Sequence, residues 1–297
     1  MTIKQCLSHC TSVLEKHSDT PALDSRIFIE EVCGISDTDF LIHPETEVSP
    51  QQFEKIKSLL DRRVLGFSVA YAVGHKWFYR HNFKTPEGVL VPRPDTETLV
   101  ENAVEYATGR IDGGKTKLRI LDLCAGTGCI GISTADEILR RRAGTEIELH
   151  MSDISGVAYK TFTENAQNIL TQSSVSVHGH LGDLFSPLAG LKFDMILTNP
   201  PYIESSVIPT LSPEVRREPL LALDGGEDGL DIIRKIIVLS PMHMHAGSML
   251  MIEGGYNQGP AIRTLLEKNL FSDVEVIKDL GGNDRVVSGL CNTLNFA

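Results

Sequence analysis

The chain has 297 residues, enough for one large domain or two smaller ones. Hydrophobic residues make up 41% of it and charged residues 23%, an average composition that supplies a real core. The formal net charge of −11 argues against a protein that holds naked DNA or RNA on a broad basic surface.

Cysteine usage and hydropathy indicate the compartment. The six cysteines are scattered, which favours reduced thiols. No stretch approaches a transmembrane span, and Met1 to Gln5 lead into an amphipathic segment and not into a signal peptide. We therefore expect a cytoplasmic protein with no membrane partner. Cys6, His9 and Cys10 share one helix, but no second ligand pair complements them, so we predict core packing and no metal site.

Three segments near the N-terminus carry apolar residues at helical spacing: 2–18, 21–34 and 50–66. Thr20 and Ser49, each followed by a proline, are the expected N-caps of the second and third helices. These segments predict a small helical bundle over residues 1–70. The bundle has no acid–base cluster, so we expect it to recognise a substrate, with structural shielding as the alternative.

Residues 71–92 are predicted to be a β-hairpin connector, formed by the runs Trp77–Tyr79 and Asn82–Lys84. From residue 93 onward, strand patterns alternate with helix patterns. This alternation predicts an α/β domain over 93–297, with a doubly wound, mostly parallel sheet of about seven strands and a reversed strand near the end.

The first strand of that domain, residues 118–123, leads into a glycine-rich turn. Glycines between a strand and a helix let a ligand approach the backbone closely. The turn consists of Cys124, Ala125, Gly126, Thr127 and Gly128. No Gly-Lys-Ser/Thr ending follows, which argues against a Walker-type phosphate site. The glycine spacing alone does not exclude a dinucleotide-binding site.

Acids follow the next strands. Asp153 can accept hydrogen bonds from both ribose hydroxyls of a nucleoside, although it could also cap the following helix. The third strand ends in Gly-Asp-Leu-Phe, where Asp183 and Leu184 could meet the edge and face of an adenine. Together with Asp122 and Asn199, these residues lie at or just past strand ends, where open α/β sheets bind ligands.

The fourth strand, residues 193–198, ends in Asn199-Pro200-Pro201-Tyr202. The prolines stop the strand and hold Asn199 in the extended range. The Asn199 side-chain oxygen and the Pro200 carbonyl are two acceptors beside the Tyr202 ring, a set that suits a planar NH2 group. Taken alone, the motif could equally be a strand-terminating turn with Tyr202 as packing.

The order of these motifs resembles the S-adenosylmethionine-dependent methyltransferases that modify exocyclic or amide nitrogens. More narrowly, the chain resembles the HemK/PrmC family, the peptide chain release factor glutamine N5-methyltransferases. Three further stretches carry the narrower resemblance: Val91–Glu97, Arg217–Pro219 with the following Ala222-Leu223, and Gly282–Val286. The resemblance runs from about Tyr71 to the end. Cys124 departs from it, because many relatives carry glycine there.

The resemblance implies a Rossmann-like class I methyltransferase fold that uses S-adenosylmethionine and releases S-adenosylhomocysteine. The implied substrate is the glutamine of the Gly-Gly-Gln motif in class I release factors, with no stable nucleic-acid partner. The expected cofactor-binding residues are Cys124, Ala125, Gly126, Thr127, Gly128, Asp153, Asp183, Leu184 and Asn199. The expected substrate-binding residues are Asn199, Pro200, Pro201 and Tyr202, of which Asn199, Pro200 and Tyr202 are expected to be catalytic.

A mechanism follows from these residue types. An amide nitrogen is a poor nucleophile that gains positive charge as the methyl arrives. The Asn199 oxygen and Pro200 carbonyl can accept its two N–H bonds and stabilise that charge, while Tyr202 holds the amide plane. No strong base is required. Arg93 and Glu97 are expected to brace the loop.

Other functions compete. A DNA or RNA adenine N6-methyltransferase can use the same loop and would flip a base onto Tyr202, but it would want a basic target-recognition region, which the sequence lacks. A dehydrogenase or a non-catalytic S-adenosylmethionine binder would not need Asn-Pro-Pro-Tyr. Within the favoured class, a sister enzyme methylates a glutamine of a large-subunit ribosomal protein, and the sequence leaves that substrate open.

Overall fold

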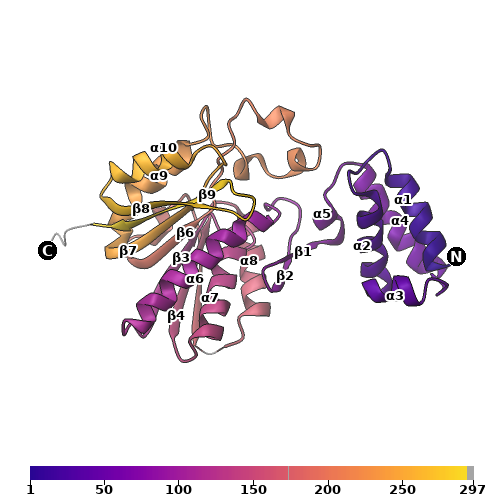
Figure 1. The fold of residues 1–297 in the computed structure, drawn as a ribbon, viewed down its shortest axis with the longest axis horizontal. Helices are drawn as coiled ribbons and strands as arrows, with labels where there is room; N and C mark the ends of the chain where they lie inside the picture. Colours follow the sequence, from indigo (N-terminus) through magenta and orange to yellow (C-terminus); the bar gives the residue numbers. More distant parts are fainter. Residues whose placement is uncertain (173, 293–297) are drawn as a thin grey trace. The chain divides into compact units, whose positions relative to one another are not determined.

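The computed structural model describes residues 1–172 and 174–292. These residues form two compact units, and most of their helices and strands are labelled in Figure 1. The first unit comprises Met1–His75 together with the short segment Leu211–Arg217. The second comprises Lys76–Thr210 and the chain from Glu218 onward. A segment distant in sequence therefore belongs to the N-terminal unit.

The first unit is a helical bundle. Its helices are α1 (Ile3–Leu14), α2 (Pro21–Cys33), α3 (Asp37–Ile42), α4 (Pro50–Val64) and α5 (Val69–Val73). Cys6 and Cys10 are buried with Phe28 in its apolar core, which agrees with the predicted packing role. The sequence did not predict α3 and α5, because six and five residues are too few to reveal a helical period.

Only one of the two predicted N-caps forms. Ser49 accepts the backbone N–H of Gln52 at 3.2 Å, and the Gln52 side chain accepts the Ser49 N–H in return, which completes a capping box at α4. Thr20 precedes α2, but its hydroxyl donates to Asp24 Oδ1 at 3.0 Å and caps no backbone group. Thr20 has φ −129° and ψ 55°, outside the extended range typical of an N-cap, and the predicted capping bond does not form.

Arg63 binds the segment Leu211–Arg217 to this bundle through an ion pair. Its side chain is nearly buried, with Nε 2.8 Å from Asp24 Oδ2 and Nη2 2.8 Å from Glu214 Oε2. Arg217 adds a second attachment, because its guanidinium lies 4.3 Å from the centre of the Phe67 ring. A nearly buried charge must be paired, so removing either carboxylate should destabilise this arrangement.

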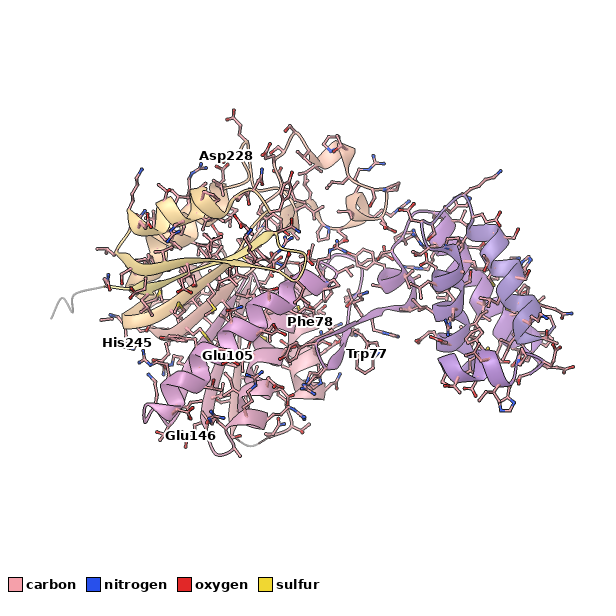
Figure 2. The ribbon with its side chains drawn as sticks, in the orientation of Figure 1. Trp77, Phe78, Glu105, Glu146, Asp228 and His245 are labelled. Atoms are coloured by element: carbon pink, nitrogen blue, oxygen red, sulfur yellow. The ribbon has the colours of Figure 1, made fainter. Side chains whose placement is uncertain are left out.

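A two-stranded sheet of β1 (His75–Phe78) and β2 (His81–Lys84) lies within the predicted connector. Successive strand residues face opposite sides. Trp77 is 66% exposed whereas Phe78 is 2% exposed, and both are labelled in Figure 2. Phe78 and Phe83 pack into the core of the second unit.

The second unit contains one seven-stranded sheet with the order β5-β4-β3-β6-β7-β9-β8. Its strands are β3 (Lys117–Leu123), β4 (Glu146–Asp153), β5 (Val175–Leu181), β6 (Phe193–Thr198), β7 (Met244–Glu253), β8 (Phe271–Lys278) and β9 (Asp284–Cys291). β9 runs antiparallel to both of its neighbours, β7 and β8, and the pairs among β5, β4, β3, β6 and β7 are parallel. The mostly parallel sheet with a reversed strand near the end is confirmed.

Helices cover both faces of the sheet (Figure 1). They are α6 (Glu97–Asp112), α7 (Cys129–Arg141), α8 (Gly156–Ile169), α9 (Asp231–Leu239) and α10 (Gly259–Glu267). One apolar cluster joins α6, α7 and α8 to the sheet, and a second joins α9 and α10 to it. Along β3, Ile120 belongs to the first cluster and Leu121 to the second, as expected of a strand buried on both faces.

The strand order reverses between β3 and β6. From β3 the chain moves outward to β4 and β5, and it then returns to β6 on the other side of β3. In open α/β sheets, the carboxyl ends of strands beside such a switch form the ligand crevice. Among the described residues, no helix combines the length and apolarity needed to cross a bilayer.

Candidate active site

A cavity that opens to solvent lies at the carboxyl ends of β3, β4, β5 and β6. Most of the residues expected to bind cofactor line this cavity: Cys124, Ala125, Gly126, Thr127, Asp153, Asp183, Leu184 and Asn199. Pro201 of the predicted substrate set lines it too. Strand-end residues far apart in sequence thus share one cavity.

The glycine turn is fixed by backbone hydrogen bonds. Gly126 donates its N–H to Asp153 Oδ2 at 2.9 Å, and Ala125 donates to the Ser152 carbonyl at 3.1 Å. Cys124 has φ 59°, a left-handed conformation in which glycine is favoured. The Cys124 departure from the family pattern therefore falls on a strained backbone position.

Gly128 has a different role from the one predicted. It is not among the residues that line the cavity. Its φ is 77°, and a Cβ built on it would lie 2.8 Å from Phe162 Cβ and 3.0 Å from Met151 Sδ. This glycine permits close packing of α7 and α8 on the sheet, so its expected cofactor contact is replaced by a packing role.

Asp153 uses both carboxylate oxygens to organise the turn. Oδ2 accepts from Gly126, and Oδ1 accepts the Ser155 N–H at 2.9 Å. Ser155 is the N-cap of α8, so the capping alternative for Asp153 does not hold. Each carboxylate oxygen keeps a further acceptor position that a ribose hydroxyl could use. Burial raises the pKa of this carboxyl.

Unlike Asp153, Asp122 does not line the cavity. It is fully buried, and Oδ2 accepts the N–H of Gly131 at 2.8 Å, which ties the first turn of α7 to β3. Burial raises its pKa to about 8. It is not among the cavity-lining residues, so the expectation that Asp122 belongs to the ligand edge was wrong.

Asp183 and Leu184 follow β5 and differ in exposure. Asp183 is exposed, whereas Leu184 is buried in the second apolar cluster. The N–H of Gly182 donates to the Asp153 carbonyl at 3.0 Å, which holds the two strand ends together. The cavity therefore has a charged group beside an apolar wall on this side.

The Asn199–Tyr202 loop is held from several sides. Asn199 Nδ2 donates to Thr96 Oγ1 at 3.4 Å, and the carbonyl of Tyr202 accepts from Gln258 Nε2 at 2.9 Å. Pro200 is buried, and neither Pro200 nor Tyr202 is among the cavity-lining residues. Asn199 and Pro201 are the members of the motif that border the cavity.

Tyr202 connects the loop to a buried acid. Its hydroxyl donates to Glu253 Oε1 at 3.5 Å, and its ring packs against the second apolar cluster. Burial raises the pKa of the Tyr202 phenol and raises the pKa of Glu253 to about 7. A carboxyl with such a pKa changes charge near neutral pH.

Arg93 and Glu97 brace other segments than the one predicted. Glu218 accepts the Val91 N–H at 3.0 Å and forms an ion pair with Arg93. Glu97 accepts the N–H of Tyr79, at 2.9 Å. Arg93 thus holds the segment leading to the cavity residues Pro219, Leu221 and Ala222, and Glu97 holds the hairpin.

Sequence reasoning missed Thr96, Glu253 and Gln258. Glu253 ends β7, the parallel neighbour of β6, so the rule that selected Asp153 and Asn199 would also have selected it. Thr96 and Gln258 lie on helix-proximal segments whose contact with the loop depends on the tertiary fold. Thr96 lies within Val91–Glu97, a stretch that carries the family resemblance, and it lines the cavity, whereas no local pattern marks Gln258.

One side-chain cluster has metal-ligand chemistry. Ligand atoms of Glu148, His150 and His178 all lie within 4.8 Å of one another. Glu148 is already paired with Arg119 at 3.0 Å. His150 uses both ring nitrogens, with Nδ1 2.8 Å from His180 Nε2 and Nε2 3.1 Å from Glu148 Oε1. Glu148 and His150 therefore already have polar partners within the described part of the chain.

Two family models match the chain. The model described as PrmC N-terminal domain matches residues 5–74, and the model described as Methyltransferase small domain matches residues 101–211. Curated proteins called release factor glutamine methyltransferase match nearly end to end. The Haemophilus influenzae protein is 32% identical and the alignment covers 97% of this chain and 99% of the relative. The Vibrio cholerae protein is 35% identical, with 99% and 98% covered.

Solved structures support the fold. The hMettl16 catalytic domain in complex with a MAT2A 3′UTR hairpin has a TM-score of 0.52 at 12% identity, covering 91% of this chain and 92% of that one. The T. Thermophilus 16S rRNA N2 G1207 methyltransferase, in complex with AdoMet and guanosine, has a TM-score of 0.50 at 16% identity, covering 73% and 50%. At these identities the likeness concerns architecture alone, and it agrees with a class I methyltransferase fold.

Proposed function

Because the chain belongs to the release factor glutamine methyltransferases, we propose that it transfers a methyl group from S-adenosylmethionine to the side-chain nitrogen of a glutamine. The acceptor is the glutamine of the Gly-Gly-Gln motif in class I peptide chain release factors. One observation carries this proposal: Asn199 lines the same cavity as Gly126 and Asp153. An amide-binding loop and a nucleoside-binding edge thus meet in one site.

The residues around the cavity fit S-adenosylmethionine. Asp153 offers a free acceptor position on each carboxylate oxygen for the ribose hydroxyls. Leu184 supplies an apolar surface for the adenine and Asp183 an acceptor for its amino group. When bound, S-adenosylmethionine supplies an electrophilic methyl group. The turn from Cys124 to Thr127 then borders the cofactor through its backbone.

The loop activates the acceptor by binding its two amide hydrogens. The Asn199 oxygen and the Pro200 carbonyl accept these hydrogens and stabilise the positive charge that develops on nitrogen. Tyr202 fixes the amide plane, so that the nitrogen lone pair faces the methyl carbon. The new N–C bond forms as the S–C bond breaks and its electron pair returns to sulfur. The nitrogen then loses one proton to water, which leaves a neutral N-methyl amide.

Substrate recognition extends beyond the tripeptide. We assign residues 1–70 to recognition, 71–92 to the connector and 93–297 to methyl transfer. Two glycines leave the tip of the substrate loop without side chains, so one glutamine can enter a narrow pocket. The helical region binds a second surface of the release factor. A short Gly-Gly-Gln peptide should therefore be a far poorer acceptor than the intact factor, and equal rates would remove the recognition role.

Radiolabelled methyl transfer tests the function directly. The purified chain is incubated with labelled S-adenosylmethionine and, in parallel, with class I release factors, a large-subunit ribosomal protein and unmethylated DNA. We expect label only in the release factors, and none in a release factor whose motif glutamine is replaced by alanine. Label in the ribosomal protein or in DNA alone would overturn the assignment.

A further inference from the structure

Two buried polar residues contact the Asn199–Tyr202 loop and have no part in the mechanism above, and one of them, Thr96, also lines the cavity. Thr96 is 2% exposed and ends the 3-10 turn Pro94–Thr96 before α6. Glu253 is 1% exposed and ends β7. In the sheet register Thr198 is opposite Ile252, so Asn199 and Glu253 leave adjacent parallel strands at the same edge.

The contact with Thr96 determines which way the Asn199 amide points. Asn199 Nδ2 donates to Thr96 Oγ1 at 3.4 Å, and Oδ1 has no partner among the described residues. The two groups leave the same amide carbon in different directions, so binding one of them sets the other. The opposite orientation would turn an NH2 donor toward the substrate, whose own amide presents two donors.

Glu253 is a neighbour of the Thr96 hydroxyl and attracts its hydrogen. A hydroxyl has one hydrogen to donate, and it can still accept. The hydrogen-bonding effect of Thr96 on Glu253 lowers the pKa of the carboxyl, so the hydroxyl favours the ionised acid. When its hydrogen is directed to the carboxylate, the Thr96 oxygen is left to accept from Asn199.

Glu253 also reaches the other end of the motif. The Tyr202 hydroxyl donates to Glu253 Oε1 at 3.5 Å, while Oε2 has no hydrogen-bond partner in the described part of the chain. Contacts of 3.4–3.5 Å are long for hydrogen bonds. Catalytic hydrogen bonds are often long before substrate binds and shorten in the complex.

We propose that Thr96 and Glu253 are positioning residues, which orient the Asn199 amide oxygen and the Tyr202 ring toward the acceptor glutamine. This inference rests on the proposed function. Thr96, which also borders the cavity, acts through Asn199, and Glu253 acts through Tyr202. The arrangement explains how a loop residue with a rotatable amide presents an acceptor in one orientation only.

The ionisation of Glu253 makes the arrangement sensitive to pH. Burial raises its pKa to about 7, while Thr96, Arg285 and Tyr202 lower it and Asp95 opposes them. The ionised carboxylate is the stronger acceptor for the Tyr202 hydroxyl, which donates to Oε1 at 3.5 Å. The turnover rate should therefore rise as pH increases through about 7, and replacing the acid with a neutral amide should remove that rise.

The test compares steady-state methylation of an intact release factor by wild type, Thr96→Val and Thr96→Ser. Valine keeps the shape but removes the hydroxyl, so kcat should fall about tenfold with little change in KM for S-adenosylmethionine. Serine restores the hydroxyl and should recover most of the rate. Thr108→Val is the matched control: Thr108 is also buried, but its hydroxyl donates to the Glu105 carbonyl within α6 at 3.0 Å.

The outcomes separate the inference from the function. If wild type methylates the release factor and Thr96→Val keeps kcat within twofold, or Thr96→Ser loses as much as Thr96→Val, the inference is wrong. If Thr96→Val does not fold, the pH profile of Glu253→Gln decides: an unchanged rise through pH 7 overturns the role of Glu253. A wild-type chain that methylates no release factor overturns the proposed function, and the inference with it.

Discussion

The backbone N–H of Gly126 and the carboxylate of Asp153 are joined by a hydrogen bond of 2.9 Å. This bond links the turn after β3 to the end of β4, so the two walls of the cavity cannot move independently. It also fixes the Asp153 side chain before any ligand arrives. Preorganisation of this kind reduces the side-chain ordering that binding would otherwise require.

Replacing Asp153 should weaken cofactor binding. Asp153→Ala removes the acceptor for the ribose and frees the glycine turn, so the Kd for S-adenosylhomocysteine should rise roughly tenfold or more. Isothermal calorimetry on the purified variants measures this. Asp112→Ala is a suitable control, because Asp112 is an exposed partner of Arg142 away from the cavity lining. Tight binding of NAD in place of the S-adenosyl compound would contradict the assignment of the cavity.

Replacing Asn199 should affect turnover and leave binding nearly intact. Asn199→Ala should lower kcat on the order of a hundredfold or more, because it removes an acceptor that acts on charge in the transition state. Tyr202→Ala should also be impaired, whereas Tyr202→Phe keeps the ring and should retain most of the rate. The measurement is kcat together with the S-adenosylhomocysteine Kd for each variant. A near-normal rate for Asn199→Ala would make Asn199 a structural turn residue.

The two glycines Gly128 and Gly144 allow backbone strain to be separated from packing. Both have left-handed φ, but a Cβ at Gly128 would clash with Phe162, whereas nothing lies within 4 Å of one at Gly144. Gly144→Ala should cost roughly 1 kcal/mol of unfolding free energy from strain alone. Gly128→Ala should cost about 3 kcal/mol, because overpacking adds to the strain. Denaturant unfolding measures both, and equal costs would show that the core relaxes around the added methyl group.

Asp122 should make stability depend on pH. Burial raises its pKa from 3.8 to about 8 in the folded chain, so the folded state holds this proton over a range where the unfolded state has lost it. The free energy of unfolding should therefore decrease as pH rises from about 4 to about 8, by about 1.4 kcal/mol per pH unit from this group. Asp122→Asn keeps an acceptor for Gly131 and should remove that part of the slope.

A control for this prediction is Asp112→Asn. The Asp112 pKa is lowered by its hydrogen bonds to Arg142, so its effect on stability falls below the same pH window. Urea unfolding at several pH values between 4 and 8 compares the three chains. Parallel curves for wild type and Asp122→Asn would mean that Asp122 is ionised in the folded protein.

The sequence predicted best where a residue's role follows from its position along a strand. Asp153 and Asn199 were selected because they follow strands, and the structure brings both to the cavity. Gly128 was assigned to the cofactor because spacing cannot distinguish a glycine that meets a ligand from one that meets a neighbouring helix. Asp122 was misplaced for a similar reason: its side chain points to Gly131, and only the packing of α7 determines that.

Other features depend on contacts that no local pattern encodes. The short helices α3 and α5 are below the length at which periodicity is visible. Thr20 caps no backbone group, because its backbone conformation lies outside the extended range of an N-cap. Gln258 reaches the Tyr202 carbonyl from 56 residues away in sequence. Such long-range polar contacts are properties of the folded chain.

The membership of residues 211–217 in the N-terminal unit has a consequence for any attempt to take this protein apart. The chain passes from one unit to the other three times, after residues 75, 210 and 217. No single cut therefore separates the units. A deletion of the first 68 residues removes Arg63 and leaves its partner Glu214 behind. The N-terminal unit cannot be exchanged between relatives as an independent module unless the seven residues 211–217 are exchanged with it.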